Sequence, residues 1–511
     1  MKFLSKLSLA CVFLFVYSCN NPDLFDNFFN HHDDDHEQND HINFQYKSTI
    51  SVGGEGASEI SAYDAKSKRL FVVNVELHQI SVFNISNIDS PMEETPIVLG
   101  TGSPNSVAVN KGLLAIAVEA DPKQNLGSIL VYDTTSLNML HSYQVGALPD
   151  MVTFSPNGQY IVSANEGEPN DDYTVDPEGT ISIIDVSSGQ VSTLNFQSFT
   201  NKKASLEDKG LRVFGPNASF AQDIEPEYVA ISENSRYAWV TLQENNGVAK
   251  VNLKSKKIEA IYPLGFKDYN VPGNEIDPSD KDDVKALNNW PVYGVYMPDA
   301  IKYLKVHGTD FIITANEGDS RDYSGFGEEE RIADVTLDET IFPNFVELQK
   351  KENLGRLKIT STLGDVDNDG DYDKLYSFGA RSFSVWTGNG QLVFDSGNDI
   401  ATQTLALTPD RFNDDDGRSD DKGAEPESVE ILKIKDKYIL FVGLERNDQI
   451  LVYDISNPTS PVFLNILSNS GDEAPEGLLA IPAKESPTGK DLLVVSNEDS
   501  GTVSFYENVN N

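Results

Sequence analysis

Short apolar runs recur along the chain from residue 43 onward, separated by glycine, asparagine, aspartate and serine. This pattern is typical of β-strands joined by tight turns. Seven stretches share a degenerate phrase in which a polar residue precedes an apolar one, and in six of the seven a proline comes first. The phrase is clearest in "IEPEYV" at 224–229 and "AEPESV" at 424–429. A feature that returns at intervals indicates a repeat architecture before it indicates chemistry.

An apolar strand ending in glutamate follows each phrase, and a third strand rich in β-branched and aromatic residues usually comes next. Three or four short strands per unit are typical of a propeller blade. We therefore predict an all-β fold, a seven-bladed β-propeller over residues 43–511, in which residues 43–53 form the outer strand of the last blade. The units are longest between Glu166 and Glu445, which predicts acidic loop insertions in the middle blades. One helix is predicted over 339–354.

In a propeller the first strand of each blade lines the central channel, so the carboxylate after each proline should face the channel. The glutamate that ends the second strand should emerge beside it. Two carboxylates ~6 Å apart repel by about 3 kcal/mol at an effective dielectric of about 20, so a ring of them needs cations, protonation or amide partners. Alternatively, these acids hydrogen-bond backbone amides and join neighbouring blades. The predicted channel-mouth acids are Asp150, Glu166, Glu227, Glu244, Asp299, Glu445, Glu476 and Glu498.

Residues 365–373, "DVDNDGDYD", place aspartates at alternate positions around Gly370. Calcium takes roughly six to eight oxygen ligands, and a glycine permits the sharp bend that wraps a loop around the ion. Tyr376 stands where an EF-hand has glutamate, so we predict a calcium loop of another kind, with a bare acidic turn as the alternative. Two further acid-rich stretches, 164–179 and 411–427, are hypotheses for divalent sites or solvated loops. The predicted calcium ligands are Asp365, Asp367, Asp369, Asp371 and Asp373.

The composition disfavours several classes of partner and of catalytic site. With 80 acidic and 39 basic residues the formal charge is -41, which disfavours nucleic acid as a partner and attracts divalent cations. Both cysteines, Cys11 and Cys19, lie near the N-terminus, so the predicted propeller has no thiol for a disulfide, a zinc site or nucleophilic catalysis. Most histidines fall in "HHDDDHEQNDH", which leaves little for a histidine-built metal centre or a Ser/His/Asp triad.

Basic residues are scarce, so their positions matter. Arg321, Arg381 and Arg418 lie close in sequence to the presumed functional face and could hold a phosphate beside calcium, or pair with nearby carboxylates. Together with Glu317 and Glu427 they are the candidate catalytic residues of a calcium-dependent phosphoesterase, in which metal ions held by aspartates activate water. Whether the chain is an enzyme stays open. Glycan recognition through aromatics such as Trp290 or Tyr323 is a weaker hypothesis, because core packing accounts for most aromatics.

The N-terminal residues predict export. Residues 1–19 carry two lysines ahead of a short apolar run, the pattern of a signal peptide. Their last residues, "VYSC", resemble a lipobox, in which Cys19 would carry the lipid; an ordinary signal peptide with a secreted product is the alternative. Residues 20–42 are rich in histidine and aspartate and predict a disordered tether. The expected location is extracytoplasmic, with a lipid anchor in a bacterial membrane, at the outer membrane or cell surface.

Four motifs, "ANEGDSRDYSGFGEEERI", "GDVDNDGDYDKLYSFGARSFSVW", "RFNDDDGRSDDKGAEPESVEI" and "GDEAPEGLLAI", resemble the choice-of-anchor I proteins, secreted bacterial propellers fixed to the cell by variable anchors. The likeness covers nearly all of 43–508. Some members are fused to phosphoesterase domains, and some are labelled alkaline phosphatases or compared with phytase-like propellers, so the resemblance implies fold and location more than activity.

The leading hypothesis is a lipid-anchored propeller that binds Ca²⁺ as its cofactor and presents an acidic face to an extracellular ligand. If the chain is instead a phosphoesterase, the ligand is a phosphorylated small molecule. We expect a monomer that contacts the membrane only through its N-terminal lipid.

Overall fold

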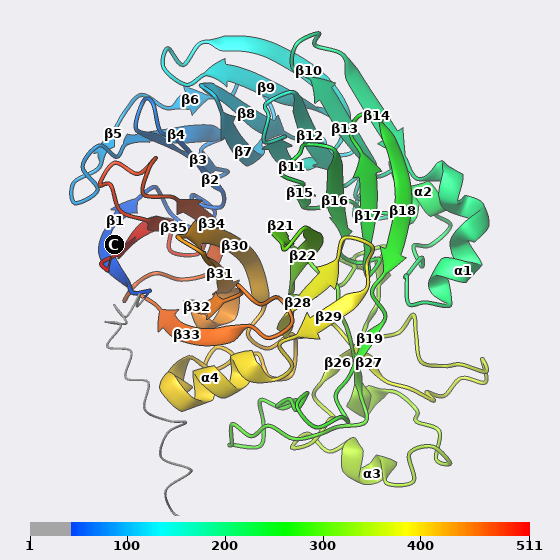
Figure 1. Ribbon diagram of the computed structural model, residues 1–511. Helices are drawn as coiled ribbons and strands as arrows, with labels where there is room; N and C mark the ends of the chain where they lie inside the picture. Colours follow the sequence, from blue (N-terminus) through cyan, green and yellow to red (C-terminus); the bar gives the residue numbers. More distant parts are fainter. Residues whose placement is uncertain (1–41, 511) are drawn as a thin grey trace, which may run out of the picture. The chain divides into compact units, whose positions relative to one another are not determined.

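The computed structural model describes residues 42–510, so the predicted signal peptide, Cys19 and nearly all of the predicted tether lie outside the described residues. Strands account for 42% of the residues and helices for 8%, so the fold is all-β, as the sequence predicts (Figure 1). None of the helices within 42–510 has the length and apolarity needed to span a bilayer.

Seven antiparallel sheets of four or five strands make up most of the structure. The first four are formed by β2 (Ser61–Asp64), β3 (Arg69–Asn74), β4 (Gln79–Asn84), β5 (Met92–Glu93) and β6 (Ile97–Val98); β7 (Pro104–Asn110), β8 (Leu113–Val118), β9 (Leu126–Asp133) and β10 (Met139–Ala147); β11 (Pro149–Phe154), β12 (Tyr160–Asn165), β13 (Thr180–Asp185) and β14 (Val191–Asn195); and β15 (Val229–Ile231), β16 (Tyr237–Leu242), β17 (Gly247–Asn252) and β18 (Lys257–Pro263).

The last three sheets are formed by β21 (Ile301–Val306), β22 (Thr309–Asn316), β28 (Ser382–Thr387) and β29 (Leu392–Asp395); β30 (Pro426–Ile434), β31 (Lys437–Leu444), β32 (Gln449–Asp454) and β33 (Val462–Leu467); and β34 (Pro475–Ile481), β35 (Leu492–Asn497), β36 (Thr502–Asn508) and β1 (Phe44–Ser51).

The first strands of these sheets lie side by side in a ring. β2 contacts β7, β7 contacts β11, and the series continues through β15, β21, β30 and β34 back to β2. Figure 1 looks along the axis of this ring. The circle closes through β1, in which Phe44 pairs with Asn508 of β36, so the prediction that residues 43–53 contain the outer strand of the last sheet is confirmed. The arrangement is a β-propeller.

The position of a strand within its sheet explains its composition. All six residues of β12 and all six of β35 are buried, because neighbouring sheets cover both of their faces. Outer strands are more exposed, as in β33, where only the last residue is fully buried. Apolar side chains fill the space between sheets; one cluster joins Leu70 and Val72 of β3 to Val494 and Phe505 of the last sheet. The core is therefore distributed around the ring.

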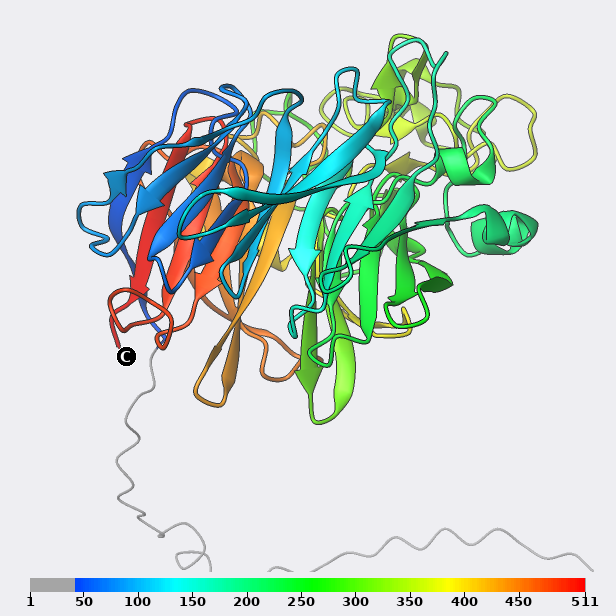
Figure 2. The same cartoon turned by 90° about the horizontal axis from the view of Figure 1, so that it is seen from above.

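Two insertions, residues 266–295 and 322–377, form what we call the insertion lobe. They come together where β20 pairs in parallel with β27, and they share a core that includes Tyr269, Val292 and Leu357. Figure 2 shows the lobe on the face of the ring opposite the turn between β21 and β22, which is the face where β22 ends. Its strands are β19 (Phe266–Asp268), β20 (Tyr293–Val295), β23 (Asp322–Tyr323), β24 (Phe326–Gly327), β25 (Glu329–Arg331), β26 (Lys358–Thr360) and β27 (Tyr376–Ser377).

Helices are short. The prediction of a helix over 339–354 is wrong in extent, because only α3 (Phe345–Leu348) is helical there. Pro343 lacks an amide hydrogen and restricts the backbone just before this turn, so the helix does not extend toward residue 339. The other helices are α1 (Lys203–Glu207), α2 (Phe220–Asp223), α4 (Asp399–Leu407) and the 3₁₀ turns η2 (Gln197–Lys202), η3 (Ile332–Asp334), η4 (Pro409–Arg411) and η5 (Glu445–Asn447).

Candidate functional site

The polar residue after the phrase's proline lies at a break in strand register. In β11 the pairing with the next strand skips from Pro149 to Met151, and in β34 it skips from Pro475 to Gly477. Asp150 and Glu476, the skipped residues, thus occupy β-bulges. Because a bulge redirects a side chain relative to the regular pleat, the repeated phrase has a structural reason: it turns a carboxylate toward the axis of the ring.

The glutamate that ends the second strand is brought to the same place by a backbone hydrogen bond. Its amide donates to the carbonyl oxygen of a residue that precedes the phrase's proline in the same unit. Both polar side chains of a unit therefore meet at the mouth of the channel. Four units share this bond, with N–O distances between 2.8 and 3.0 Å, and the donor–acceptor pairs are Glu119–Ser103, Glu166–Leu148, Glu445–Glu425 and Glu498–Ala474.

The ring formed by the first strands of the sheets encloses a cavity of about 330 Å³. None of the described side chains that line it is basic. The hydroxyl oxygens of Ser103 and Ser428 also line it, each buried and without a hydrogen-bond partner among residues 42–510. Negative groups therefore face one another across the cavity with no positive group between them. The carboxylates of the lining are Glu59, Glu119, Asp150, Asp299 and Glu476.

Burial raises the pKa of these carboxyls, and mutual repulsion adds to the effect. Burial, followed by the charges of neighbouring carboxylates, raises the pKa of Glu59 to about 8. Burial and then the charge of Glu119 raise the pKa of Asp150 to about 6. The pKa values of Asp299 and Glu476 are raised well above their usual range for the same reasons. Near neutral pH such groups either keep a proton or need a cation nearby.

Glu166, Glu227 and Glu244 form a second buried group beside the cavity, each no more than 9% exposed. Burial first, and then the neighbouring carboxylates, raise each of their pKa values well above the usual range. One carboxylate oxygen of Glu244 has no hydrogen-bond partner within 42–510. Glu498 is half-buried, and burial raises its pKa as well. The structure thus brings the predicted channel-mouth acids into one connected region.

Glu317, Glu427 and Glu445 form a third group of carboxylates at the mouth. Each offers a carboxylate oxygen, and these oxygens lie within 4.8 Å of one another. Two bases neutralise part of their charge: Lys422 Nζ lies 2.6 Å from Glu317 Oε1, and Arg446 Nη2 lies 2.8 Å from Glu445 Oε1. Even so, burial and then the charges of Glu317 and a neighbouring glutamate raise the pKa of Glu445 to about 8. Three clustered carboxylate oxygens are suitable ligands for a hard cation.

The first glutamate of the phrase has a different role, which the sequence pattern did not single out. Glu225 is bound by Arg321, with Nη2 2.7 Å from Oε2, and Glu425 is bound by Arg418 at 2.6 Å. Lys422 also approaches Glu425, at 3.3 Å. These bases lower the pKa of Glu425 although it is fully buried. The signal was present in the sequence, since "EPE" is written at both sites.

The candidate phosphate-binding arginines make contacts within the protein. Arg321 is 2% exposed and also pairs with Asp223. Arg381 is buried and donates from Nη1 to the carbonyl oxygen of Asp277 and from Nη2 to that of Ser419, at 2.8 and 2.9 Å. Arg418 is partly exposed but bound to Glu425. Of the two alternatives given by the sequence, Arg321 shows the pairing with carboxylates, whereas Arg381 binds backbone carbonyls; protein partners thus occupy both buried guanidinium groups.

The aspartate loop, residues 365–373, is exposed on the insertion lobe. Carboxylate oxygens of Asp365, Asp367 and Asp373 lie within 4.8 Å of one another, and those of Asp338, Asp371 and Asp373 form a second such group. Asp338 comes from outside the loop. Asp369 belongs to neither group. The structure thus brings four of the five predicted calcium ligands into two overlapping groups.

The two other acid-rich stretches differ from each other. In 411–427, Asp420 pairs with Arg356 and Asp421 pairs with Lys358, so this stretch is joined to the insertion lobe by ion pairs. In 164–179, Asp171 and Asp172 are exposed.

One family model and two known proteins are similar to parts of this chain. A family model described as "Choice-of-anchor I domain" matches residues 59–458. Gigasin-3a of Magallana gigas is 34% identical over 188 residues, which cover 31% of this chain and 66% of that protein. Mesenchyme-specific cell surface glycoprotein of Strongylocentrotus purpuratus is 25% identical over 373 residues, which cover 62% of this chain and 46% of that protein. The chain thus spans less than two thirds of the length of either relative.

Two solved structures resemble the chain at low sequence identity. Kuenenia stuttgartiensis hydrazine synthase has a TM-score of 0.49 at 11% identity, covering 91% of this chain and 100% of that chain. The Cps50 (Swd1) β-propeller domain of Myceliophteria thermophila has a TM-score of 0.48 at 7% identity, covering 91% and 99%.

Proposed function

Because the chain belongs to the choice-of-anchor I domain family, we propose that it is an extracytoplasmic binding module that uses calcium to hold an acidic propeller mouth together. The seven sheets are the blades of a seven-bladed propeller. Cys19 carries a lipid anchor, and the face that bears the insertion lobe is presented to an extracellular ligand.

The observation that carries this proposal is the cavity of about 330 Å³ lined by five carboxylates and no basic side chain. Repulsion among these groups opposes folding unless protons or cations neutralise them. Calcium prefers several carboxylate and carbonyl oxygens in a flexible arrangement, and the carboxylates that line the cavity are suitable ligands of this kind. The large negative charge of the chain also favours the binding of divalent cations.

Two observations support the location. Residues 1–19 have the pattern of a signal peptide that ends in a lipobox-like "VYSC". One relative is named a cell surface glycoprotein, although the chain covers only 46% of that protein.

The test is calcium binding by the purified full chain, measured by isothermal titration and by metal analysis after dialysis. We expect bound calcium and a higher melting temperature with calcium than with chelator. Glu166→Gln should weaken both effects, because Glu166 is buried at the mouth. Glu76→Gln is the matched control, since Glu76 ends the second strand of another unit but is exposed. A chain that binds no calcium, or that binds it equally well in both variants, would contradict the proposal.

A calcium-dependent phosphoesterase is the second candidate. The observation that favours it is the group Glu317, Glu427 and Glu445, which has Lys422 and Arg446 beside it. Carboxylates could hold metal ions there, and the two bases could bind a phosphorylated small molecule. Hydrolysis of p-nitrophenyl phosphate that is lost with chelator and with Glu427→Gln would establish the enzyme. No turnover by calcium-loaded protein would exclude this ester as a substrate.

A further inference from the structure

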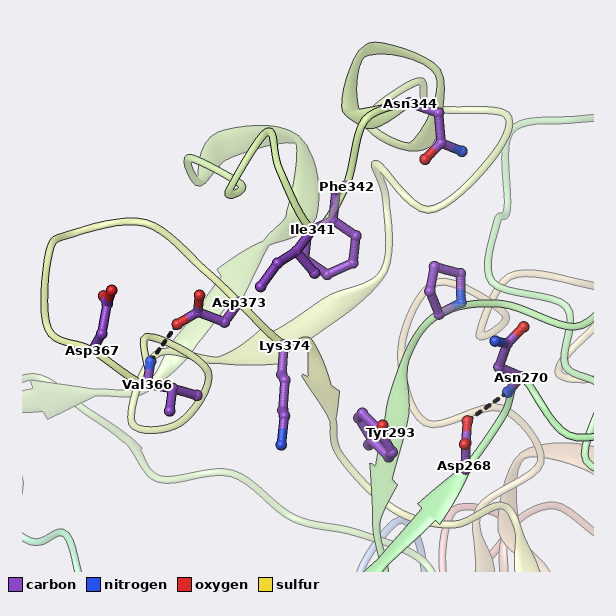
Figure 3. Close-up of a pocket in the computed structure, with 11 residues that line it drawn as sticks. Asp268, Asn270, Tyr293, Ile341, Phe342, Asn344, Val366, Asp367, Asp373 and Lys374 are labelled. Carbon is purple, nitrogen blue, oxygen red and sulfur yellow. Dashed lines mark hydrogen bonds between the residues drawn. The ribbon is translucent and has the colours of Figure 1, made fainter.

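The insertion lobe contains a hollow of about 550 Å³ that is separate from the channel (Figure 3). Its walls come from β19, β20, the segment 341–344 before α3, and the aspartate loop. Sites for small molecules commonly have volumes of about 300 to 1,000 Å³, so the hollow has the size of a ligand site. No role proposed above uses the hollow itself, although Asp367 and Asp373 in its wall are among the predicted calcium ligands.

One part of the lining is apolar and open to water. Ile341 is 50% exposed and Val366 is 63% exposed, and Pro291 and Phe342 complete the apolar part of the lining. Apolar side chains that gather in a concave exposed place are a common mark of a binding site. A ligand with an apolar face would remove this surface from water.

The remaining lining offers hydrogen bonds that the protein does not use. The side-chain amides of Asn270 and Asn344, the hydroxyl of Tyr293 and the ammonium of Lys374 make no hydrogen bond or ion pair with residues 42–510. One carboxylate oxygen of Asp268 accepts a hydrogen bond from the backbone N–H of Asn270, at 2.9 Å, and the other carboxylate oxygen is free. Figure 3 shows Ile341 and Lys374 on one side of the hollow, with Asn270 and Asn344 on the other.

Part of this lining is held in place before any ligand arrives. The ring of Tyr293 stacks on Tyr376 at 5.4 Å with an interplanar angle of 28°. The Asp268 carboxylate is held by the backbone of Asn270. Groups fixed in this way lose less conformational entropy when a ligand binds.

This mixture of groups identifies a ligand class. A sugar ring has a face of C–H groups that packs on apolar side chains, and hydroxyls that each donate and accept hydrogen bonds. Amides, a tyrosine hydroxyl, an ammonium and a carboxylate together match hydroxyls in both senses. Without calcium in the aspartate loop, Asp268, Asp367 and Asp373 outnumber Lys374 in the lining, and the chain carries a charge of -41, so an anionic ligand is disfavoured. We propose that the hollow is a binding site for a neutral oligosaccharide.

This site differs from the aromatics that the sequence suggested for glycan binding. Tyr323 packs edge-to-face against Tyr173 at 5.5 Å and does not line the hollow. Trp290 packs against the core of the lobe, and the hollow is lined by its neighbour Pro291. The proposal also does not depend on calcium in the channel, because no channel acid lines the hollow.

The test is binding of defined trisaccharides to the full chain in the presence of chelator, so that the aspartate loop carries no calcium. Neutral trisaccharides of glucose, galactose, mannose and N-acetylglucosamine are compared with trigalacturonate and a sulfated heparin fragment, first on an array and then by calorimetric titration. We expect at least one neutral trisaccharide to bind and the anionic ones to bind more weakly. Lys374→Ala and Asn270→Ala should each weaken binding about tenfold, the effect of losing about 1.4 kcal/mol of hydrogen bonding.

Lys209→Ala is the matched control, since Lys209 is also an exposed lysine without a side-chain partner within 42–510 but lies outside the hollow. It should leave binding unchanged. Tyr293→Phe keeps the ring and loses the hydroxyl, so a smaller weakening is expected without loss of folding. The proposal is overturned if no neutral trisaccharide binds, if the anionic ones bind better, or if Lys374→Ala and Lys209→Ala behave alike.

Discussion

The channel and the aspartate loop both bring carboxylates together, but they do so in different surroundings. In the channel the first cause of the raised pKa values is burial, as for Glu59 and Glu476. In the loop the pKa of Asp367 is raised chiefly by the charge of Asp369, and the side chain stays in water. A solvated carboxylate remains charged at little cost, whereas a buried one opposes folding unless it is neutralised.

Because of this difference in burial, a bound cation should have different effects in the channel and in the aspartate loop. A cation in the channel offsets repulsion that the folded chain cannot relieve by solvation, so its binding should appear as stability. A cation in the loop replaces water around groups that are already solvated, so its binding should appear in a metal titration and hardly in the unfolding of the ring. A third situation lies beside the channel, where Arg321 neutralises buried acids from within the chain.

The largest effect is expected from removing that internal neutralisation. Arg321→Met leaves Asp223 and Glu225 buried without their base, and the free energy of unfolding should fall by about 3–5 kcal/mol. Urea-induced unfolding measures this. Arg236→Met, at an exposed arginine that contacts the ring of Tyr237, is the control and should cost much less. Equal losses in the two variants would show that burial of the pair does not matter.

The dependence of stability on pH should be the next largest effect, because several channel acids act together. The pKa of Glu59 rises from 4.5 to about 8 on folding, and that of Glu445 also reaches about 8. Between these pH values the unfolded chain loses protons that the folded chain keeps. In chelator, the contribution of these two groups to the free energy of unfolding should therefore be fully present below pH 4.5. It should be lost as the pH rises to about 8. Melting temperatures across this range test the sign.

Calcium should flatten this pH profile, because a bound cation takes the place of the protons. A profile in chelator that rises with pH would mean that the channel acids are neutralised by the protein itself.

A single substitution in the channel should have a smaller effect of the opposite sign. Glu476→Gln removes one charge from the cavity and keeps the shape of the side chain, so stability in chelator should increase by about 1 kcal/mol. The stabilisation by calcium should shrink at the same time. Asn105 occupies the equivalent place in another unit, so an amide fits there. Destabilisation of the variant in chelator would show that Glu476 is not repelled in the native state.

The smallest effect on folding is expected in the aspartate loop. Asp367→Asn should leave the melting temperature in chelator unchanged and lower the amount of calcium bound to the full chain. Asp369→Asn, in the same loop but in neither group of clustered carboxylates, is the matched control and should bind as much calcium as the natural chain. If both variants lose calcium alike, the loop binds through its overall charge.

The fold could be predicted from the sequence where the signal was local and repeated. The returning phrase with its proline, and the apolar strand that ends in glutamate, indicated a propeller and brought Asp150, Glu166 and Glu476 to one region. Regular repetition makes such positions equivalent in space, so one unit predicts the others.

Features that depend on contacts between distant segments could not be predicted in this way. The partners of Arg321 lie almost a hundred residues away, at Asp223 and Glu225, and no spacing rule relates them. The insertion lobe exists because β20 and β27, from separate insertions, pair in parallel. The helix predicted over 339–354 followed the apolar period and underestimated the effect of Pro343.

The pairing of β1 with β36 has a consequence for how the chain acquires its structure during synthesis. β1 is the first described strand to leave the ribosome and its partner is the last, so the segment around Phe44 must wait for almost the whole chain. Contacts of such long sequence separation form late and slowly. Until then the last sheet lacks an outer strand and exposes unpaired backbone groups, and this period is when the nascent protein most needs protection from aggregation.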